Sequence, residues 1–361
     1  MDQSELKGVI LHGGHGTRLR PLTHTGPKQL IPVANKPISQ FVLEDLKSSG
    51  VEEIAIIVGD ILPEKVQNYY KDGSEFGAKI TYIHQKNPGG IAEAVCLAKD
   101  FVGTSPFVVY LGDNLLKGRV TEFVKEFSSS SYDAMVLLCQ VENPSRFGVA
   151  EFDNNGNLAR LIEKPKRPPS KYALTGIYFL KPLIFKLIRR LKPSGRGELE
   201  ITEALQALID DGYKVAHRFV TGWWKDTGTI EDILEANRLV LDSLQKRING
   251  VVEDTHSIQG RVAIGKDSVV KRGALIRGPA IIGEKSTVSG GVYVGPFTSI
   301  GNGVRVERGE IENSIIMDEC SIEIDGKITD SLVGAGTTLS TNQKNPKGYR
   351  LVVGENSKIV L

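Results

Sequence analysis

This chain of 361 residues has almost no net charge, because 45 basic residues stand against 43 acidic ones and the formal charge is +2. A surface that binds polyanions in general needs a clear excess of Lys and Arg, so the charge balance excludes a general nucleic-acid-binding surface. Any recognition of phosphate must therefore be local.

Cysteine is also scarce, and Cys96, Cys139 and Cys320 form no Cys-x-x-Cys pair. An odd number of widely spaced cysteines argues against a disulfide framework and against a metal site built on thiolates. Long apolar runs are absent too: no stretch nears the ~18 residues of a membrane span, and the first residues are polar and acidic. We therefore expect a cytoplasmic protein with reduced thiols that enters no membrane.

Aromatic residues nearly vanish after residue 250, where only Tyr293, Phe297 and Tyr349 remain. Glycine changes in the opposite sense, with 22 in residues 1–249 and 17 in the 112 residues that follow. A chain of this length is too long for one ordinary core, and the change in composition indicates where it divides. We predict two domains, residues 1–249 and residues 250–361.

Short apolar runs alternate with helix-period stretches in the first domain. Four runs have the length of buried parallel strands, at residues 9–11, 54–58, 80–83 and 107–111. Apolar residues recur at helical spacing over residues 38–46, 120–127 and 230–244. The alternation predicts an α/β layered sheet with right-handed crossovers, in which ligands bind beyond the carboxyl ends of the strands.

A glycine-rich turn follows the first of these runs, at Gly13, Gly14 and Gly16. Glycines let backbone N–H groups approach a phosphate chain, and Arg18 and Lys28 supply positive charge nearby. The turn fits neither a Walker loop nor a dinucleotide fingerprint, because the required Gly-Lys-Ser/Thr and the third glycine are missing. A plain chain reversal is the alternative interpretation, but the neighbouring charges favour a triphosphate site.

Two aspartates are candidate metal ligands. Asp113 directly follows the run at 107–111, and Asp226 comes just after Trp223 and Trp224. A carboxylate at the end of a buried strand, beside a triphosphate loop, is a natural ligand for Mg²⁺. A helix cap or a turn is the alternative for Asp113. Together with the glycine-rich turn, the two aspartates predict a Mg²⁺ site.

The stretch GGHGTRLRPLT…PKQLIPVANKP resembles the signature of the sugar-1-phosphate nucleotidylyltransferases. Further stretches match that family in its order and cover nearly all of residues 6–240: QKNPGGIAEAV, YLGDN, RFGVAEFD, EKP, LTGIYF, GRGELEIT and WWKDTGT. The PKQ and QKNPGGIA stretches are most similar to the long-form glucose-1-phosphate thymidylyltransferases of the family. The resemblance implies a Rossmann-like nucleotidyltransferase sheet with helices on both faces, followed by a left-handed parallel β-helix.

The resemblance also implies an activity. A thymidylyl group would pass from dTTP to glucose 1-phosphate, by in-line attack on the α-phosphate that gives dTDP-glucose and pyrophosphate. Arg18 and Lys28 would hold the triphosphate and the leaving pyrophosphate, and Lys164 would hold the phosphate of the sugar. Asp113 and Asp226 would bind Mg²⁺ as the cofactor. UTP in place of dTTP, and a different sugar 1-phosphate, stay open.

Substrate contacts are implied in the same way. The nucleotide would contact the turn and two glutamines, at Leu11, Gly13, Gly14, Gly16, Thr17, Arg18, Gln29, Gln85 and Gly90. The sugar phosphate would contact Asn114, Gly148, Glu163, Lys164, Thr175 and Gly176. His12 departs from the family, which usually carries a small residue such as Ala at this position. Arg196 is either a phosphate contact or a loop charge.

An aliphatic β-branched residue recurs at every sixth position from Val252 to Val306. Small residues stand four positions after five of these ten residues, at Ser268, Ala274, Ala280, Ser286 and Thr298. This is the hexapeptide signature of a parallel β-helix, in which the aliphatic residues stack inward. The repeat loses phase at Glu312 and resumes at Ile316, which predicts an insertion or a bulged coil. We expect Tyr349–Leu361 to cap the open end.

The second domain leaves two alternative functions open. Hexapeptide domains are often acyltransferases, so one alternative is a bifunctional UTP-dependent uridylyltransferase with acetyltransferase activity, although His256 is the only histidine after residue 250. The other is a non-catalytic regulatory homologue, although the charged set is complete. We expect instead a homo-oligomer that associates through the β-helix, the catalytic domain or both.

Overall fold

The computed structural model describes residues 5–341 and divides into two compact units. The first unit comprises the described residues up to Gly16, Thr25–Leu30 and Ile38–Asp226. The second comprises Thr17–His24, Ile31–Pro37 and the described residues from Thr227 onward. The domain boundary between residues 249 and 250 stays a prediction. The second unit includes two short N-terminal segments that no change of composition indicates.

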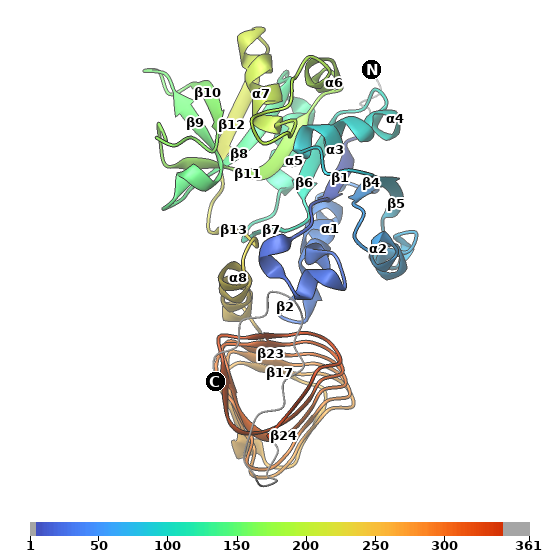
Figure 1. Cartoon of the computed structure of the whole chain (residues 1–361), viewed down its shortest axis with the longest axis vertical. Helices are drawn as coiled ribbons and strands as arrows, with labels where there is room; N and C mark the ends of the chain where they lie inside the picture. Colours follow the sequence, from blue (N-terminus) through green and yellow to red (C-terminus); the bar gives the residue numbers. More distant parts are fainter. Residues whose placement is uncertain (1–4, 342–361) are drawn as a thin grey trace. The chain divides into compact units, whose positions relative to one another are not determined.

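A nine-stranded mixed sheet forms the centre of the first unit (Figure 1). Its longest path runs β10-β9-β11-β6-β1-β4-β5, with β8 and β12 joined to it through β11. The strands are β1 (Lys7–His12), β4 (Glu53–Val58), β5 (Lys79–His84), β6 (Phe107–Leu111), β8 (Ala134–Gln140), β9 (Gly148–Phe152), β10 (Leu158–Glu163), β11 (Tyr172–Leu180) and β12 (Val215–Phe219). Strands β6, β1, β4 and β5 pair in parallel, which confirms the four strands that the apolar runs predict.

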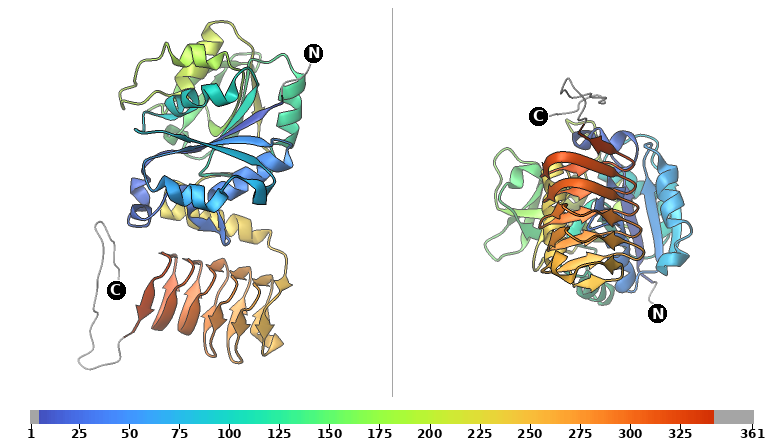
Figure 2. Two further views of the ribbon diagram at one scale, coloured as in Figure 1. Left: turned by 90° about the vertical axis from the view of Figure 1, so that its right-hand side faces the viewer. Right: turned by 90° about the horizontal axis from the view of Figure 1, so that it is seen from below.

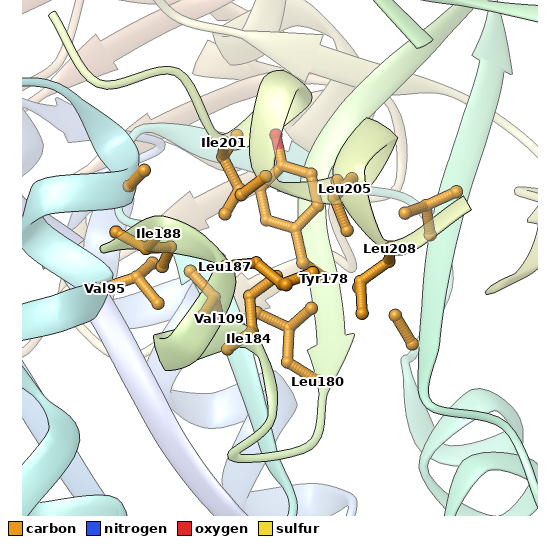
Figure 3. Packing of buried hydrophobic residues seen from close by; sticks show 14 of the residues in the cluster. Val95, Val109, Tyr178, Leu180, Ile184, Leu187, Ile188, Ile201, Leu205 and Leu208 are labelled. Atoms are coloured by element: carbon orange, nitrogen blue, oxygen red, sulfur yellow. The ribbon is translucent and has the colours of Figure 1, made fainter. Parts of the chain in front are cut away.

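Helices cover both faces of this sheet. Those of one face are α1 (Ile38–Ser48), α2 (Pro63–Tyr70) and α5 (Thr121–Ser129). Those of the other face are α3 (Ile91–Leu97), α4 (Lys99–Val102), α6 (Ile184–Ile188) and α7 (Ile201–Asp210). Along β1, Ile10 packs in the core beneath α1, α2 and α5, and Val9 packs in the core beneath α3, α4, α6 and α7. Successive side chains of a strand point to opposite faces of the sheet. Figure 3 shows α6 and α7 packed around Tyr178 of β11. The predicted sheet with two covered faces is confirmed.

Shorter elements complete the first unit. After β6 the chain makes a turn and forms β7 (Asn114–Leu116), which pairs antiparallel with β13 (Trp224–Asp226). Single turns of 3-10 helix lie at η3 (Lys28–Leu30), η4 (Ser74–Phe76) and η5 (Pro144–Arg146). No helix among residues 5–341 is both long and apolar enough to cross a membrane. The ribbon of β7 and β13 matters most for function, because it extends the carboxyl end of β6.

A parallel β-helix makes up most of the second unit and appears as a stack of coils in Figure 2. Each repeat residue is aligned with its counterpart in the next coil, as Val252 is with Val270 and Val270 with Val288. One coil therefore corresponds to three hexapeptides. The aliphatic repeat residues fill the interior, and the small residues Ser268, Ala274, Ala280, Ser286 and Thr298 are buried beside them. The parallel β-helix is confirmed, and its left-handed sense stays a prediction.

The strands of the β-helix are short. One side consists of β14 (Arg247–Ile248), β17 (Val262–Ile264), β20 (Ala280–Ile282), β23 (Thr298–Ile300), β25 (Ile315–Ile316) and β27 (Leu332–Val333). The other sides consist of β15 (Val251–Val252), β16 (Ile258–Gln259), β18 (Val269–Val270), β19 (Leu275–Arg277), β21 (Thr287–Val288), β22 (Tyr293–Val294), β24 (Arg305–Glu312), β26 (Ser321–Thr329) and β28 (Thr338–Ser340).

The loss of phase near Glu312 has a local cause. Ile311 pairs with Val294 and lies in the interior, one residue earlier than the six-residue spacing requires. Strands β24 and β26 shift register between Val306 and Arg308. A bulged coil is therefore confirmed. The spacing of inward residues falls to five from Val306 to Ile311 and again from Ile311 to Ile316, so two sides that are each one residue shorter, rather than an insertion, change the phase.

The second unit also contains a helix and a hairpin outside the coils. The helix is α8 (Ile230–Asp242), which confirms the helix predicted over residues 230–244. The hairpin consists of β2 (Pro32–Val33) and β3 (Lys36–Pro37). Turns of 3-10 helix occur at η1 (Thr17–Leu19), η2 (Leu22–His24) and η6 (Thr255–Ser257). The predicted cap, Tyr349–Leu361, lies outside the described residues.

Candidate active site

The glycine loop begins where β1 ends, at the carboxyl edge of the parallel strands. A Cβ on Gly13 would stand 2.7 Å from Oε1 of Gln85, so the loop lies directly against the end of this side chain. Gln29 donates a hydrogen bond from Nε2 to the carbonyl of Gly13 over 3.1 Å. The structure therefore brings the turn together with both glutamines that the resemblance assigns to the nucleotide.

Gln85 is held by Glu93, a residue to which sequence analysis assigns no role. Nε2 of Gln85 donates to Oε2 of Glu93 over 2.6 Å, and the N–H of Gly89 donates to the same oxygen over 2.9 Å. Glu93 lies in the first turn of α3, where the helix dipole favours a carboxylate. The loop before Gly90 is tied down as well, because the N–H of Leu199 donates to the carbonyl of Gly89 over 2.7 Å. No helix was predicted over residues 91–97, so no local signal in the sequence indicated Glu93.

Asp113 lies directly after β6 and is 7% exposed. Its Oδ2 forms a hydrogen-bonded ion pair with Nζ of Lys28, and its Oδ1 accepts from Nδ2 of Asn114 over 2.8 Å. Burial by itself raises the pKa of the Asp113 carboxyl, but the charge of Lys28 and these hydrogen bonds outweigh it and lower the pKa below its usual value. The site therefore contains a buried carboxylate that is ionised at neutral pH.

Asp226 reaches the same place through a different strand. The antiparallel pairing of β13 with β7 puts Asp226 opposite Asn114, the residue next to Asp113. Nε1 of Trp224 donates to Oδ1 of Asn114 over 2.8 Å and so holds the two strands of the ribbon together. The two aspartates, far apart in the sequence, stand at adjoining positions on this edge.

These two aspartates fit a magnesium ion. Among residues 5–341, no group of three or more His, Cys, Asp or Glu side chains forms a complete cage for a metal. Mg²⁺ needs no such cage, because proteins usually bind it through one or two carboxylates while water and substrate phosphates supply the remaining oxygens. Asp113 and Asp226 are the residues that would hold the ion.

Three of the predicted sugar-phosphate residues, Gly148, Glu163 and Lys164, lie together at the end of β10. Strand pairing puts Gly148 opposite Glu163. Oε2 of Glu163 accepts from the hydroxyl of Thr202 over 2.6 Å, while Oε1 lies 3.2 Å from a guanidinium nitrogen of Arg196 and 3.7 Å from Nζ of Lys164. Glu163 is thus fixed by its neighbours, next to the lysine that is predicted to hold phosphate. The choice between a phosphate contact and a loop charge for Arg196 stays open.

Two aromatic rings connect this group to the aspartates. The rings of Phe147 and Trp224 meet edge to face with centroids 5.1 Å apart. Gly176 closes the same edge from β11, with a φ of +73° and space for no side chain, because a Cβ there would stand 2.6 Å from Cδ1 of Leu111. A glycine is therefore required at this irregularity in β11.

Two predicted contacts are restricted by burial. Thr175 is fully buried, and its hydroxyl donates to the carbonyl of Leu137 over 3.1 Å inside the sheet. Leu11 is 6% exposed and its side chain packs in the core. Only the backbone of either residue is left to contact a substrate. Thr17 and Arg18 belong to the second compact unit, and their roles at the triphosphate stay predictions.

His12, the departure from the family pattern, packs behind the glycine loop. It is 2% exposed, its ring lies edge-on to Tyr70 at 6.2 Å, and Cδ2 would be 2.9 Å from a Cβ on Gly112. Neither ring nitrogen has a hydrogen-bond partner in the described part of the chain. Burial lowers the pKa of His12 to about 3, although the charge of Asp113 opposes this shift. The imidazole is therefore neutral at pH 7.

A cavity of about 340 Å³ shares Asn114 with this site and is lined also by Tyr110, Asp45 and Arg119. Burial raises the pKa of the Asp45 carboxyl to about 6, although the hydrogen bond from the N–H of Val120 and the charge of Arg119 oppose the shift. The folded state binds the proton of the Asp45 carboxyl more tightly than the unfolded chain does. The stability that this protonation contributes is therefore present below about pH 4 and is lost as the pH rises through 6.

Asp45→Asn is therefore expected to stabilise the protein at pH 8 by about 3 kcal/mol, since each unit of pKa difference is worth about 1.4 kcal/mol. The asparagine keeps an oxygen for the N–H of Val120 but carries no charge to bury. Urea unfolding of both proteins at pH 8 and pH 4.5 measures the effect, and the gain should shrink at the lower pH. An equal difference at both pH values would contradict the raised pKa.

Comparison with known proteins places this geometry in a family. The nucleotidyl transferase family matches residues 7–243. The low-salt glycan biosynthesis nucleotidyltransferase Agl11 of Haloferax volcanii is 49% identical over 99% of this chain and 100% of its own length. A glucose-1-phosphate thymidylyltransferase of Streptomyces antibioticus is 43% identical over 98% of this chain and 99% of its own.

A solved structure agrees with these relatives. It is a Bacillus anthracis protein described as a glucose-1-phosphate thymidylyltransferase, in complex with a sucrose. It is 40% identical to this chain, has a TM-score of 0.63, and the match covers 67% of this chain and 98% of that one. With a family match over more than half of its length and relatives that span it almost completely, this chain belongs to the nucleotidyl transferase family.

Proposed function

We propose that this enzyme transfers a thymidylyl group from dTTP to glucose 1-phosphate. The observation that carries the proposal is the ion pair of Lys28 with Asp113 at the carboxyl edge of the sheet, together with the pairing of Asp226 opposite the next residue, Asn114. Relatives named glucose-1-phosphate thymidylyltransferase, at 43% identity over nearly the full length, support the choice of substrates.

The reaction brings together two polyanions that repel each other. An oxygen of the sugar phosphate forms a bond to the α-phosphorus, and the bond from that phosphorus to the bridging oxygen breaks. Pyrophosphate leaves with the electron pair. The attacking oxygen is already anionic, so no proton needs to move, and none of the six histidines is required as a base. The protein contributes alignment and charge.

Each charged residue has a place in this scheme. Lys28 and Arg18 would neutralise the triphosphate and the departing pyrophosphate, and Lys164 would hold the sugar phosphate beside Glu163. A divalent cation held by Asp113 and Asp226 would supply positive charge that stabilises the reacting phosphates. Because Asp113 already pairs with Lys28, this carboxylate would serve both the lysine and the ion.

The base would be recognised by the amide of Gln85. The Glu93 bond turns Nε2 of Gln85 toward the helix and Oε1 toward Gly13. Uracil and thymine present the same hydrogen-bonding edge, so this amide does not separate UTP from dTTP. Discrimination would depend on the thymine methyl group and the ribose 2′-hydroxyl, and such differences are worth about 1–3 kcal/mol.

The β-helix gives acetyl transfer no comparable support. His256 is the only histidine of that domain. Its side chain is 95% exposed, and Nδ1 lies 3.0 Å from Oδ1 of its neighbour Asp254. A base for an amine acceptor is expected in a pocket that excludes water, and an exposed ring at the first coil does not meet that condition.

Pyrophosphate release tests the proposal. The enzyme is incubated with dTTP or UTP and with glucose 1-phosphate or N-acetylglucosamine 1-phosphate, in Mg²⁺ or in excess chelator. We expect release with dTTP and glucose 1-phosphate, at least about tenfold slower release with UTP, and none with chelator. A further well contains acetyl-CoA and glucosamine 1-phosphate. No release from any pair, or thiol release in that well, would contradict the proposal.

A further inference from the structure

The hairpin that follows the Lys28 segment belongs structurally to the β-helix unit. Residues 31–37 cluster with the C-terminal unit although they lie more than 190 residues from it in the sequence, and so do residues 17–24. Lys28 lies in η3, which ends at Leu30, so the hairpin begins directly after the segment that carries this lysine. Along the sequence, segments of the second unit therefore come directly before and directly after residues 25–30.

The turn of the hairpin has an unusual backbone. Ala34 and Asn35 have φ values of +48° and +61°, so both central residues are left-handed, as two-residue hairpins of the I′ type require. Asparagine tolerates this conformation, whereas alanine is strained in it. Nδ2 of Asn35 donates to the carbonyl of Ile300 over 2.6 Å, which joins the turn to strand β23 of the β-helix.

Asn237 of α8 connects the same turn to the same coil. Its side chain is completely buried. Oδ1 accepts from the backbone N–H of Ala34 over 2.8 Å and from the hydroxyl of Ser299 over 2.7 Å, and Nδ2 donates to the carbonyl of Phe297 over 2.9 Å. One amide thus holds the hairpin, the helix and the β-helix together.

We propose that Asn237 is a positioning residue for Lys28. The amide anchors the hairpin, the hairpin fixes one end of residues 25–30, and that segment places Lys28 against Asp113. The β-helix thereby contributes to nucleotidyl transfer without contacting a substrate. This inference rests on the proposed function for the role of Lys28, and it goes beyond that function by giving the C-terminal domain a part in the reaction.

Other bonds near the segment do not replace this anchor. The hydroxyl of Ser39 donates to the carbonyl of Gln29 over 3.1 Å, and the N–H of Leu30 donates to the carbonyl of Pro27. Together with the bond from Nε2 of Gln29 to the carbonyl of Gly13, these bonds hold η3 itself, whereas the Asn237 amide holds the hairpin that continues from it. Loss of the anchor should therefore leave the segment folded while its position against Asp113 becomes less defined.

A double-mutant cycle tests the inference in the full-length enzyme. Asn237→Ala should lower kcat/KM for dTTP about tenfold, measured at a temperature where circular dichroism shows the variant folded. In the Lys28→Met background the same substitution should lower the residual activity less than twofold, because residues that act through one another do not add. Asn302→Ala is the matched control, since the bonds of that asparagine, with Glu284 and Asp318, stay within the coils.

A second variant covers the case in which Asn237→Ala does not fold. Asn35→Gly removes only the amide that reaches Ile300, while glycine accepts the positive φ. It should lower kcat/KM about threefold in the wild type and not in the Lys28→Met background. Wild-type kcat/KM in a folded Asn237→Ala or in Asn35→Gly, or an equal loss in both backgrounds, would overturn the inference.

Hydrogen exchange separates this inference from the proposed function. Peptides that cover residues 25–37 should exchange faster in Asn237→Ala and Asn35→Gly than in the wild type and in Asn302→Ala. If the wild type releases no pyrophosphate, the proposed function has failed, and unchanged exchange over residues 25–37 would independently overturn the anchoring role.

Discussion

Asp113→Asn is expected to lower kcat for Mg²⁺-dependent pyrophosphate release by at least about 10³-fold. The substitution removes one of two carboxylates that would hold the ion, and charge stabilisation of this kind is worth several kcal/mol, with about 1.4 kcal/mol for each tenfold in rate. Asp226→Asn should have an effect of similar size, because β13 brings this residue to the same place. Both variants are measured by steady-state kinetics over a range of Mg²⁺ concentrations.

The control is an aspartate of the same unit that takes no part in the site. Asp133 is half-buried, and its Oδ2 accepts from the N–H of Lys214 over 3.0 Å. Asp133→Asn keeps an oxygen at that position and should retain the kcat of the wild type. Turnover within threefold of the wild type in either Asp113→Asn or Asp226→Asn would remove that residue from the metal site.

Lys28→Met should damage both activity and stability, for separable reasons. It removes a charge from the triphosphate site, with an expected loss of about 10²-fold in kcat/KM for dTTP. It also leaves the buried Asp113 carboxylate without this cation, and breaking a buried ion pair at one side costs about 3–5 kcal/mol. Pyrophosphate release measures the first effect and urea unfolding the second.

The double variant Lys28→Met, Asp113→Asn separates these two effects. With both charges gone, most of the lost stability should return, while activity should stay at or below that of either single variant. Lys47→Met is the control, because Lys47 pairs with Glu52 at an exposed site, where an ion pair is worth less than about 1 kcal/mol. Recovery of activity in the double variant would assign Lys28 a purely structural role.

The fold follows closely from periodicity in the sequence. The apolar runs at β1, β4, β5 and β6 have the length of strands in a sheet that is buried on both faces. Such near-continuous apolar runs are typical of buried parallel strands. The six-residue spacing from Val252 to Val306 is equally restrictive, because it places one inward residue on each side of every coil. The six-residue pattern did not predict that Ile311, rather than Glu312, faces the interior. A shortened side of the coil changes the phase of the repeat without changing the amino-acid composition.

The candidate site was predictable in part. Local motifs identify Asp113 and Lys28, because each follows a recognisable element or lies in the family signature. The approach of Asp226 depends on the register between β7 and β13, which is set by side-chain packing such as the bond from Trp224 to Asn114. Burial of the Thr175 hydroxyl against Leu137 depends on an irregularity in β11, which Gly176 permits but does not by itself predict.

Supporting residues were the hardest to predict. Glu93 and Thr202 act on Gln85 and Glu163 through long-range hydrogen bonds, and nothing in their local sequence requires those partners. Asn237 is an extreme case, because it lies in an ordinary amphipathic helix and its partners at Ala34 and Ser299 are remote in the chain. Buried amides that join distant segments are visible only when those segments are seen together.

Binding of Mn²⁺ in the presence of dTTP, followed by electron paramagnetic resonance, tests the shared metal site most directly. We expect one protein-bound ion in the wild type. Asp113→Asn and Asp226→Asn should each weaken its binding by at least about 30-fold, equivalent to about 2 kcal/mol for the loss of one charged ligand. Equal affinity for Mn²⁺ in the wild type and in the variant that lacks both carboxylates would contradict the account.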